Sequence, residues 1–250
     1  MSKKIKRIKT GIFGLDDLIE GGFVENSCIL IVGAPGTGKS IFALQWLFHG
    51  AKNKEPGIYF SFGESVESIK QTGYIFGWKI DEVIKKKLLK IIKLEPTITL
   101  ERVEYIIKEE VKKMKAKRIV IDSLSPLKAN AILFGILKPS ELETIATTMP
   151  FIQSEKLFIR RFTYEFVSFL KDLDVTSLLI SEEESTRDTH MIEEFIVDGV
   201  IELHHLGMGE ALKRSLFIKK LRHTKIEDEV YSLLITSKGI KIGKVEKISL

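Results

Sequence analysis

One glycine-rich segment restricts the fold of this chain more than any other feature. Residues 33–40 read Gly-Ala-Pro-Gly-Thr-Gly-Lys-Ser, a full match to the pattern Gly-x-x-x-x-Gly-Lys-Ser/Thr. The apolar, strand-like run Cys28–Val32 precedes this segment, and a helical run at residues 41–48 follows it. The sequence therefore predicts a strand, a phosphate-binding loop (P-loop) and a helix in direct succession.

The residue types of this segment fit the chemistry of phosphate. Glycines let backbone N–H groups point inward as an anion nest, and a helix N-terminus adds partial positive charge. Lys39 supplies a mobile charge for the β- and γ-phosphates, and Ser40 supplies a hydroxyl for Mg²⁺. The alternative, a glycine turn without a ligand, has little support in this context. The predicted nucleotide-binding residues are Gly33, Ala34, Pro35, Gly36, Thr37, Gly38, Lys39, Ser40 and Ile41.

A second apolar run supplies the expected partner for the metal. Residues 118–123 read Arg-Ile-Val-Ile-Asp-Ser, a strand that ends in an acidic residue. In a parallel sheet, Asp122 would emerge at the same carboxyl edge as the P-loop. An aspartate here also fits the N-cap of a helix. Because it occurs together with the P-loop, we predict that Asp122 and Ser40 hold Mg²⁺ and that the nucleotide is ATP.

Short β-like runs alternate with longer helical patterns, which is typical of an α/β fold with a mostly parallel sheet. The C-terminal part has strand-like runs without helices between them, so it predicts antiparallel strands, with a hairpin turn at residues 237–239. The predicted helices are Lys39–His49, Val66–Phe76, Leu100–Lys115 and Leu157–Leu173. The predicted strands are Cys28–Val32, Gly57–Phe62, Leu89–Leu94, Arg118–Ile121, Thr176–Ser181, Gly199–Leu203, Ser215–Leu221, Glu229–Thr236 and Ile240–Val245.

Length and composition narrow the class of protein. A chain of 250 residues that is 44% hydrophobic and 29% charged suits one α/β domain, 1–250, and not a disordered or fibrous protein. The single cysteine, Cys28, excludes an intrachain disulfide and is predicted to be buried. No secretory signal pattern is evident, and no apolar stretch reaches the roughly 20 residues that span a bilayer. We therefore expect a cytoplasmic protein without membrane insertion.

The net charge of +5 does not by itself indicate a ligand. A basic balance fits a nucleic-acid or acidic-membrane partner. However, Lys and Glu are interleaved in stretches such as 108–113, which is typical of solvated helix faces. Residues 125–155 lack a clear period, contain three prolines and include an apolar run at 129–137. A helical insertion packed on the core, or a mobile surface loop that docks a partner, both fit this segment.

With these motifs in place, the chain resembles the single-domain, archaeal and bacterial members of the KaiC-like branch of the RecA superfamily of ATPases. The resemblance implies a RecA-like P-loop fold, a three-layer α/β/α sandwich with a mostly parallel sheet and C-terminal antiparallel strands. It also implies ATP bound between neighbouring subunits of a ring, commonly a hexamer. The residues that match motifs of this family are 10–16, 21–22, 54–61, 121–124, 197–201, 220–224 and 235–240.

The resemblance assigns roles to further residues. Lys220 and Arg222 look like a Lys-x-Arg motif that reaches the γ-phosphate of the next subunit's ATP, in trans; ordinary exposed strand charges are the alternative. The family usually has two adjacent glutamates after its second strand, but here Gly63 replaces the first and only Glu64 remains. We therefore predict Lys39, Glu64 and Asp122 as catalytic residues, with slow hydrolysis. His223 replaces a family glycine, and a family histidine is absent near Ile226.

Three functions follow from these features. The leading one is a ring-forming ATPase that hydrolyses slowly. A regulator that assembles with ATP but does not hydrolyse it is the second, because of Gly63. A DNA-repair or recombinase relative is the third. The acidic residues 182–184 argue against DNA, since phosphate contacts need Lys or Arg. The resemblance to a single ATPase core carries over neither clock function nor autokinase activity.

Overall fold

The predicted strands form one mixed sheet. The computed structural model describes residues 5–95, 97–134, 151–182, 193–208 and 211–245. Within these residues, a nine-stranded sheet has the order β11-β10-β9-β8-β3-β7-β6-β4-β5, and β1 pairs with β2 separately. The strands are β1 (Arg7–Ile8), β2 (Phe23–Val24), β3 (Cys28–Gly33), β4 (Gly57–Ser61), β5 (Leu89–Lys93), β6 (Arg118–Asp122), β7 (Thr176–Glu182), β8 (Gly199–Met208), β9 (Ala211–Leu221), β10 (Val230–Thr236) and β11 (Gly239–Val245).

The sheet changes from parallel to antiparallel at β8. Strands β5, β4, β6, β7, β3 and β8 pair in parallel, whereas β8, β9, β10 and β11 pair antiparallel. The α/β class with a parallel core and antiparallel C-terminal strands is therefore confirmed. Every strand predicted for the parallel core ends within a few residues of its prediction, apart from β8, which extends to Met208.

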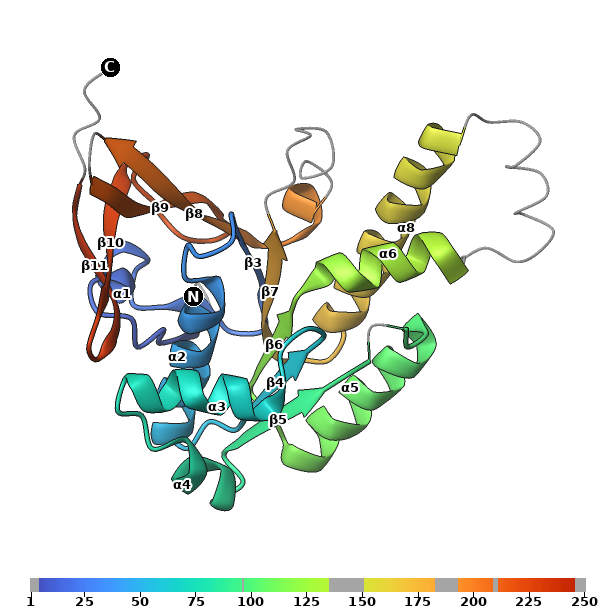
Figure 1. The fold of residues 1–250 in the computed structure, drawn as a ribbon, viewed down its shortest axis with the longest axis horizontal. Helices are drawn as coiled ribbons and strands as arrows, with labels where there is room; N and C mark the ends of the chain where they lie inside the picture. The colour runs from blue at the N-terminus through green and yellow to red at the C-terminus, as the bar shows by residue number, and fades with distance from the viewer. Residues whose placement is uncertain (1–4, 96, 135–150, 183–192, 209–210, 246–250) are drawn as a thin grey trace.

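Helices cover both faces of the sheet, which gives three layers (Figure 1). Alternate residues of β3 enter two separate cores: Ile29 and Ile31 pack with α2 and α3, whereas Leu30 and Val32 pack with α5 and α8. The period of two along a strand causes this division. The helices are α1 (Leu15–Leu18), α2 (Lys39–Lys52), α3 (Val66–Ile75), α4 (Ile80–Lys85), α5 (Leu100–Met114), α6 (Leu124–Phe134) and α8 (Phe151–Lys171).

The segment without a clear period is helical at both of its described ends. Helix α6 follows β6 closely, and its Leu124 and Leu127 are buried in the core. Helix α8 begins at Phe151, six residues before the predicted start. Residues 135–150 lie outside the described residues, as do 183–192, which include most of the acidic segment.

Among the described residues, no helix is both long and apolar enough to cross a bilayer. Cys28 is buried, as predicted, and burial strongly raises the pKa of its thiol. Its neighbours Asp198 and Lys171 modify that pKa in opposite directions.

Candidate functional site

The predicted P-loop joins β3 to α2 at the carboxyl edge of the sheet. A Cβ added to Gly33 would lie 2.3 Å from the carbonyl oxygen of Leu203 in β8, so the neighbouring strand leaves no room for a side chain. Gly38 has φ +106° and Gly36 has φ +81°, which are backbone conformations that side chains disfavour. The close approach at Gly33 and the positive φ angles at Gly36 and Gly38 explain the glycines at these three positions of the motif.

The remaining motif residues form the tip and the start of the helix. Ala34, Pro35 and Gly36 lie at the more open tip, while Thr37 is buried and its Oγ1 donates to the Ala34 carbonyl over 2.8 Å. Ile41 packs partly buried in the first turn of α2. Backbone N–H groups in the first turn of a helix have no partner four residues earlier, so they are suited to bind phosphate oxygens.

The side chain of Lys39 hydrogen-bonds to backbone carbonyl groups of the P-loop. Its ammonium group donates to the carbonyl oxygens of Gly33 over 2.7 Å and of Ala34 over 3.0 Å, and the residue is 8% exposed. The ammonium therefore lies within the loop that phosphates would occupy. A bound polyphosphate would offer stronger acceptors than these two carbonyl groups.

The predicted metal residues meet beside the loop. Ser40 Oγ donates to Asp122 Oδ2 over 2.8 Å, and the buried Tyr59 of β4 donates its hydroxyl hydrogen to the same oxygen. Burial raises the pKa of Asp122, while the hydrogen bonds from Tyr59 and Ser40 lower it in part. A hydroxyl and a carboxylate this close fit Mg²⁺, which takes oxygen ligands and few protein groups.

Glu64 is the least constrained of the predicted catalytic residues. It is exposed, and its carboxylate accepts a hydrogen bond from Ser68 Oγ over 2.7 Å, at the start of α3. Glu64 follows the carboxyl end of β4, where Ser61 is paired with Asp122 of the parallel strand β6, so Glu64 and Asp122 lie at the same edge of the sheet. A Cβ on Gly63 would meet no atom within 4 Å, so this position has room for a side chain.

Lys220 and Arg222 lie at the opposite end of the sheet from the P-loop of their own chain. Lys220 pairs with Val200, which pairs with Leu30, three residues before Gly33 on β3. This offset is about 10 Å along the strands. The ammonium group of Lys220 turns further away, toward the carbonyl groups that precede β8. The structure thus separates this pair from the other predicted residues and brings Lys39, Ser40 and Asp122 together.

A family model described as "ATPase: KaiC" matches residues 8–134 and 142–247. The chain belongs to this family of ATPases. Two positions at which the sequence departs from the KaiC family pattern, His223 and Ile226, are described by the structure. His223, at the position of a family glycine, has φ +59°, in the region that favours glycine. Ile226 is partly buried against the core near the C-terminal strands.

Two relatives of similar length match nearly the whole chain. A "UPF0273 protein" of Thermotoga maritima is 30% identical over 256 residues, which cover 95% of this chain and 96% of that protein. The crystal structure of a KaiC-like protein from Pyrococcus horikoshii matches with a TM-score of 0.79 and 30% identity, over 96% of this chain and 100% of that one. The circadian clock oscillator protein KaiC of Nostoc sp. is 30% identical over 95% of this chain. The chain spans only 44% of that protein.

Lys220 and Arg222 are held within their own chain by contacts around a short helical turn at residues 193–196. Lys220 Nζ donates to the carbonyl oxygens of Glu194 and Val197, each over 2.7 Å. Burial, with the charge of Arg222, lowers the pKa of Lys220. Arg222 donates to Asp198 Oδ1 over 3.1 Å. The amino end of the same turn is anchored by Glu193, in a buried ion pair with Lys128 of α6.

Several residues around the site were not predicted from the sequence. Tyr59 donates a hydrogen bond to Asp122, as described. From the sequence, the place of Tyr59 in an apolar strand predicts only that its side chain is buried, and not this contact. Arg214 Nε of β9 donates to the Gly36 carbonyl over 3.1 Å, and His205 of β8 lies beside the same glycine. Arg7 donates to the His223 carbonyl and to Thr224 Oγ1, each over 2.8 Å. All of these contacts join segments that are distant in sequence, so no local pattern signals them.

Proposed function

We propose that this chain binds Mg·ATP at the P-loop and hydrolyses it slowly, in a ring whose subunits complete one another's sites. The observation that carries the proposal is the convergence of Lys39, Ser40 and Asp122 at one edge of the sheet. In this reaction the P-loop N–H groups and Lys39 would hold the phosphates. Ser40 and Asp122 would hold Mg²⁺, which would neutralise developing charge on the β- and γ-phosphate oxygens.

The trans arrangement is supported by where the Lys-x-Arg pair lies. Lys220 and Arg222 are at the amino end of the sheet, away from the P-loop of their own chain, so they can serve a P-loop only in another chain. A neighbouring subunit that docks its P-loop against this end would bring the two cations to the γ-phosphate, where positive charge stabilises the transition state. A closed ring satisfies this head-to-tail contact for every subunit, and we favour a hexamer.

The test combines turnover with sizing. Purified protein is assayed for phosphate release from ATP, and its mass in solution is measured with and without Mg·ATP. We expect slow turnover and a ring that contains nucleotide. Failure of ATP to bind, or binding that Lys39→Ala leaves unchanged, would exclude the proposal.

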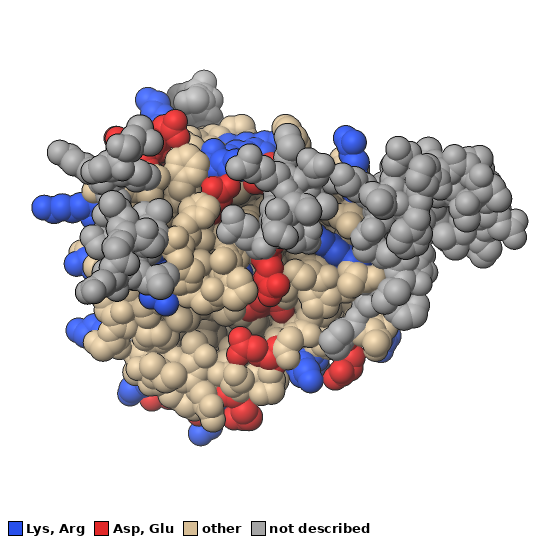
Figure 2. All heavy atoms as spheres, turned by 45° about the horizontal axis from the view of Figure 1, so that its top comes forward, with Lys and Arg blue, Asp and Glu red and all other residues tan. Residues whose placement is uncertain are grey.

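A non-hydrolysing regulator is the second candidate function, and the exposed Glu64 beside Gly63 favours it. Assembly that requires ATP, with no phosphate release, would identify this function. A DNA-binding role has less support. Figure 2 shows acidic side chains along the middle of the face that is turned forward, together with a group of Lys and Arg side chains above them, so the coloured part of this face is not the continuous basic surface that phosphate contacts favour. Absence of a gel shift even at low salt would exclude it.

A further inference from the structure

A pocket at the far end of α2 has an unbalanced set of charges. It lies between the carboxyl end of α2, helix α4 and the turn from β10 to β11, and has a volume of ≈ 720 Å³. At 1.5 Å per residue, this end of α2 is about 20 Å from Lys39 along the helix axis. The charged side chains that line the pocket are Lys52, Lys54, Lys79, Lys86, Lys238 and Glu82.

The single carboxylate of this lysine pocket is already paired. Glu82 forms an ion pair with Lys79 over 3.1 Å. Among the described residues, the other four lysines of the pocket have no acidic partner. Some lysines elsewhere on the surface are paired, as Lys90 is with Glu110 and Lys219 is with both Glu194 and Glu202; what sets this pocket apart is that four lysines without an acidic partner in the described part of the chain line one hollow. The lysine pocket therefore carries an excess of positive charge.

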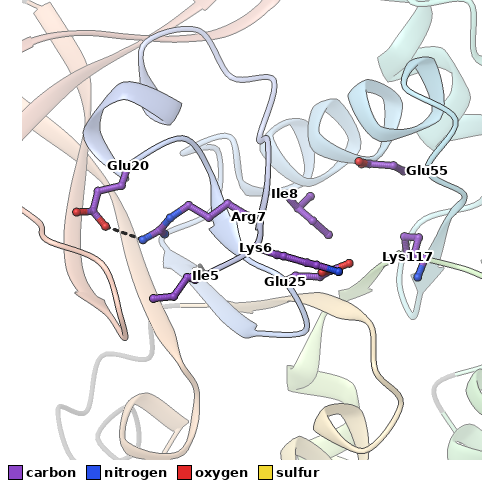
Figure 3. A pocket seen from close by; sticks show the side chains of 8 residues that line it. All are labelled: Ile5, Lys6, Arg7, Ile8, Glu20, Glu25, Glu55 and Lys117. Atoms are coloured by element: carbon purple, nitrogen blue, oxygen red, sulfur yellow. Dashed lines mark hydrogen bonds and ion pairs between the residues drawn. The ribbon is translucent and has the colours of Figure 1, made fainter. Parts of the chain in front are cut away.

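Two other pockets show the ordinary balance. The pocket beside β1 has three basic and three acidic side chains, and its Arg7 pairs with Glu20 over 2.6 Å (Figure 3). The pocket along α5 is lined by two lysines and two glutamates. Among these three pockets in the described part of the chain, the lysine pocket alone has a large excess of one charge.

The floor and rim of the lysine pocket are fixed by packing. The Trp78 ring stacks on Phe48 with centroids 5.6 Å apart, and Phe76 packs against Trp78 at 5.0 Å. Trp78 Nε1 donates to the Lys238 carbonyl over 3.1 Å, which ties the β10–β11 turn to the pocket floor. The backbone positions of the lysines on three elements are therefore held in place before any ligand arrives.

We propose that the lysine pocket binds a small molecule that carries several phosphate groups. Four ammonium groups without a carboxylate partner among the described residues, two of them at the carboxyl ends of α2 and α4, would be only partly neutralised by a monovalent anion and the helix carbonyl groups, so they favour several linked negative charges. Lysine is a common phosphate-binding residue. The volume lies within the roughly 300–1,000 Å³ of small-molecule pockets. The aromatic floor can contact an uncharged part of the ligand.

The test titrates sodium tripolyphosphate into the Lys39→Ala variant in 150 mM NaCl without metal, by calorimetry. This background weakens binding at the P-loop, so the result does not depend on the proposed function. We expect one site per chain. The double variant Lys52→Glu/Lys238→Glu should lower the affinity for tripolyphosphate at least about tenfold. The milder double variant Lys52→Gln/Lys86→Gln should lower that affinity measurably. Thermal melts confirm that each variant is folded.

The matched control is Lys112→Glu/Lys113→Glu on α5, which makes the same change in net charge. At 150 mM salt, charges beyond about 8 Å are largely screened, so this control should bind tripolyphosphate within about twofold of the Lys39→Ala background. Absence of a site, or equal losses in both double variants, would overturn the proposal. Titration of ATP distinguishes a nucleotide from a free phosphate chain. Tighter, length-dependent binding of oligo-dT would overturn it in favour of a nucleic-acid surface.

Discussion

Ser40 Oγ donates a hydrogen bond to Asp122 Oδ2 over 2.8 Å, although the two residues are 82 positions apart in the chain. The bond exists because β3 and β6 flank β7 in parallel, so that the P-loop and the end of β6 reach the same edge of the sheet. If Mg²⁺ bound here, the Ser40 hydroxyl and the Asp122 carboxylate would both hold the metal, in place of the hydrogen bond between them. Our first prediction concerns this pair.

We expect Asp122→Asn to remove the dependence of ATP affinity on Mg²⁺, with a loss of about 10–100-fold in the presence of the metal. Metal-free ATP binding should change little, because Lys39 and the loop are untouched. Burial raises the pKa of Asp122, so removal of this charge should leave the metal-free melting temperature unchanged or higher. Calorimetry and thermal melts with and without Mg²⁺ measure both effects. The exposed Asp17→Asn is the control, and an equal loss of affinity there would contradict the prediction.

We expect Gly63→Glu to increase ATP turnover by about 10²-fold, the lower end of the range for a positioned general base. The position has room, since a Cβ there meets no atom within 4 Å, and its φ needs no glycine. Phosphate release measures the effect. Gly63→Gln is the matched control, of equal size but without a carboxylate, and should stay near wild type. If both variants increase turnover alike, the carboxylate is not the cause.

The sequence predicted most of the fold because strands with continuous apolar residues and the P-loop are local patterns. Strand Arg118–Asp122 was one residue longer than predicted, and its terminal aspartate is at the expected edge. The short helices α1 and α4 were missed, since four to six residues give too little periodicity. The contacts that shape the site, such as Tyr59 with Asp122, depend on which strands are neighbours. A single sequence does not encode that in any local pattern.

We expect Lys39→Ala and Lys220→Ala/Arg222→Ala each to lose ATP turnover, the latter by about 10²–10³-fold. When the two proteins are mixed in equal amounts and reassembled, turnover should recover to about a quarter of wild type. In a ring, half of the P-loops are intact, and half of these have an intact neighbour. Lys219→Ala is the control, because Lys219 is on the same strand but pairs with Glu194 and Glu202. Co-assembly of the two variants without recovery would contradict action in trans.

We expect Asp198→Asn to destabilise the fold at neutral pH and to lose this effect in acid. Burial alone would raise the pKa of Asp198, but hydrogen bonds from Lys171 Nζ and the Cys28 N–H, with the charge of Arg222, lower it below the usual value. A carboxyl group with a lowered pKa contributes stability above its unfolded pKa, near 3.9, and this contribution is lost as the pH falls through the folded pKa.

At pH 7 the loss for Asp198→Asn should be about 1–2 kcal/mol, or a decrease of roughly 2–8 °C in melting temperature for a chain of this size. The difference from wild type should persist down to about pH 5 and shrink below pH 4. Thermal melts at pH 7, 5 and 3.5 measure it. Asp172→Asn, an exposed aspartate in the turn after α8, should leave the melting temperature unchanged at every pH. A difference for Asp198→Asn that is constant with pH would show that its charge does not stabilise the fold.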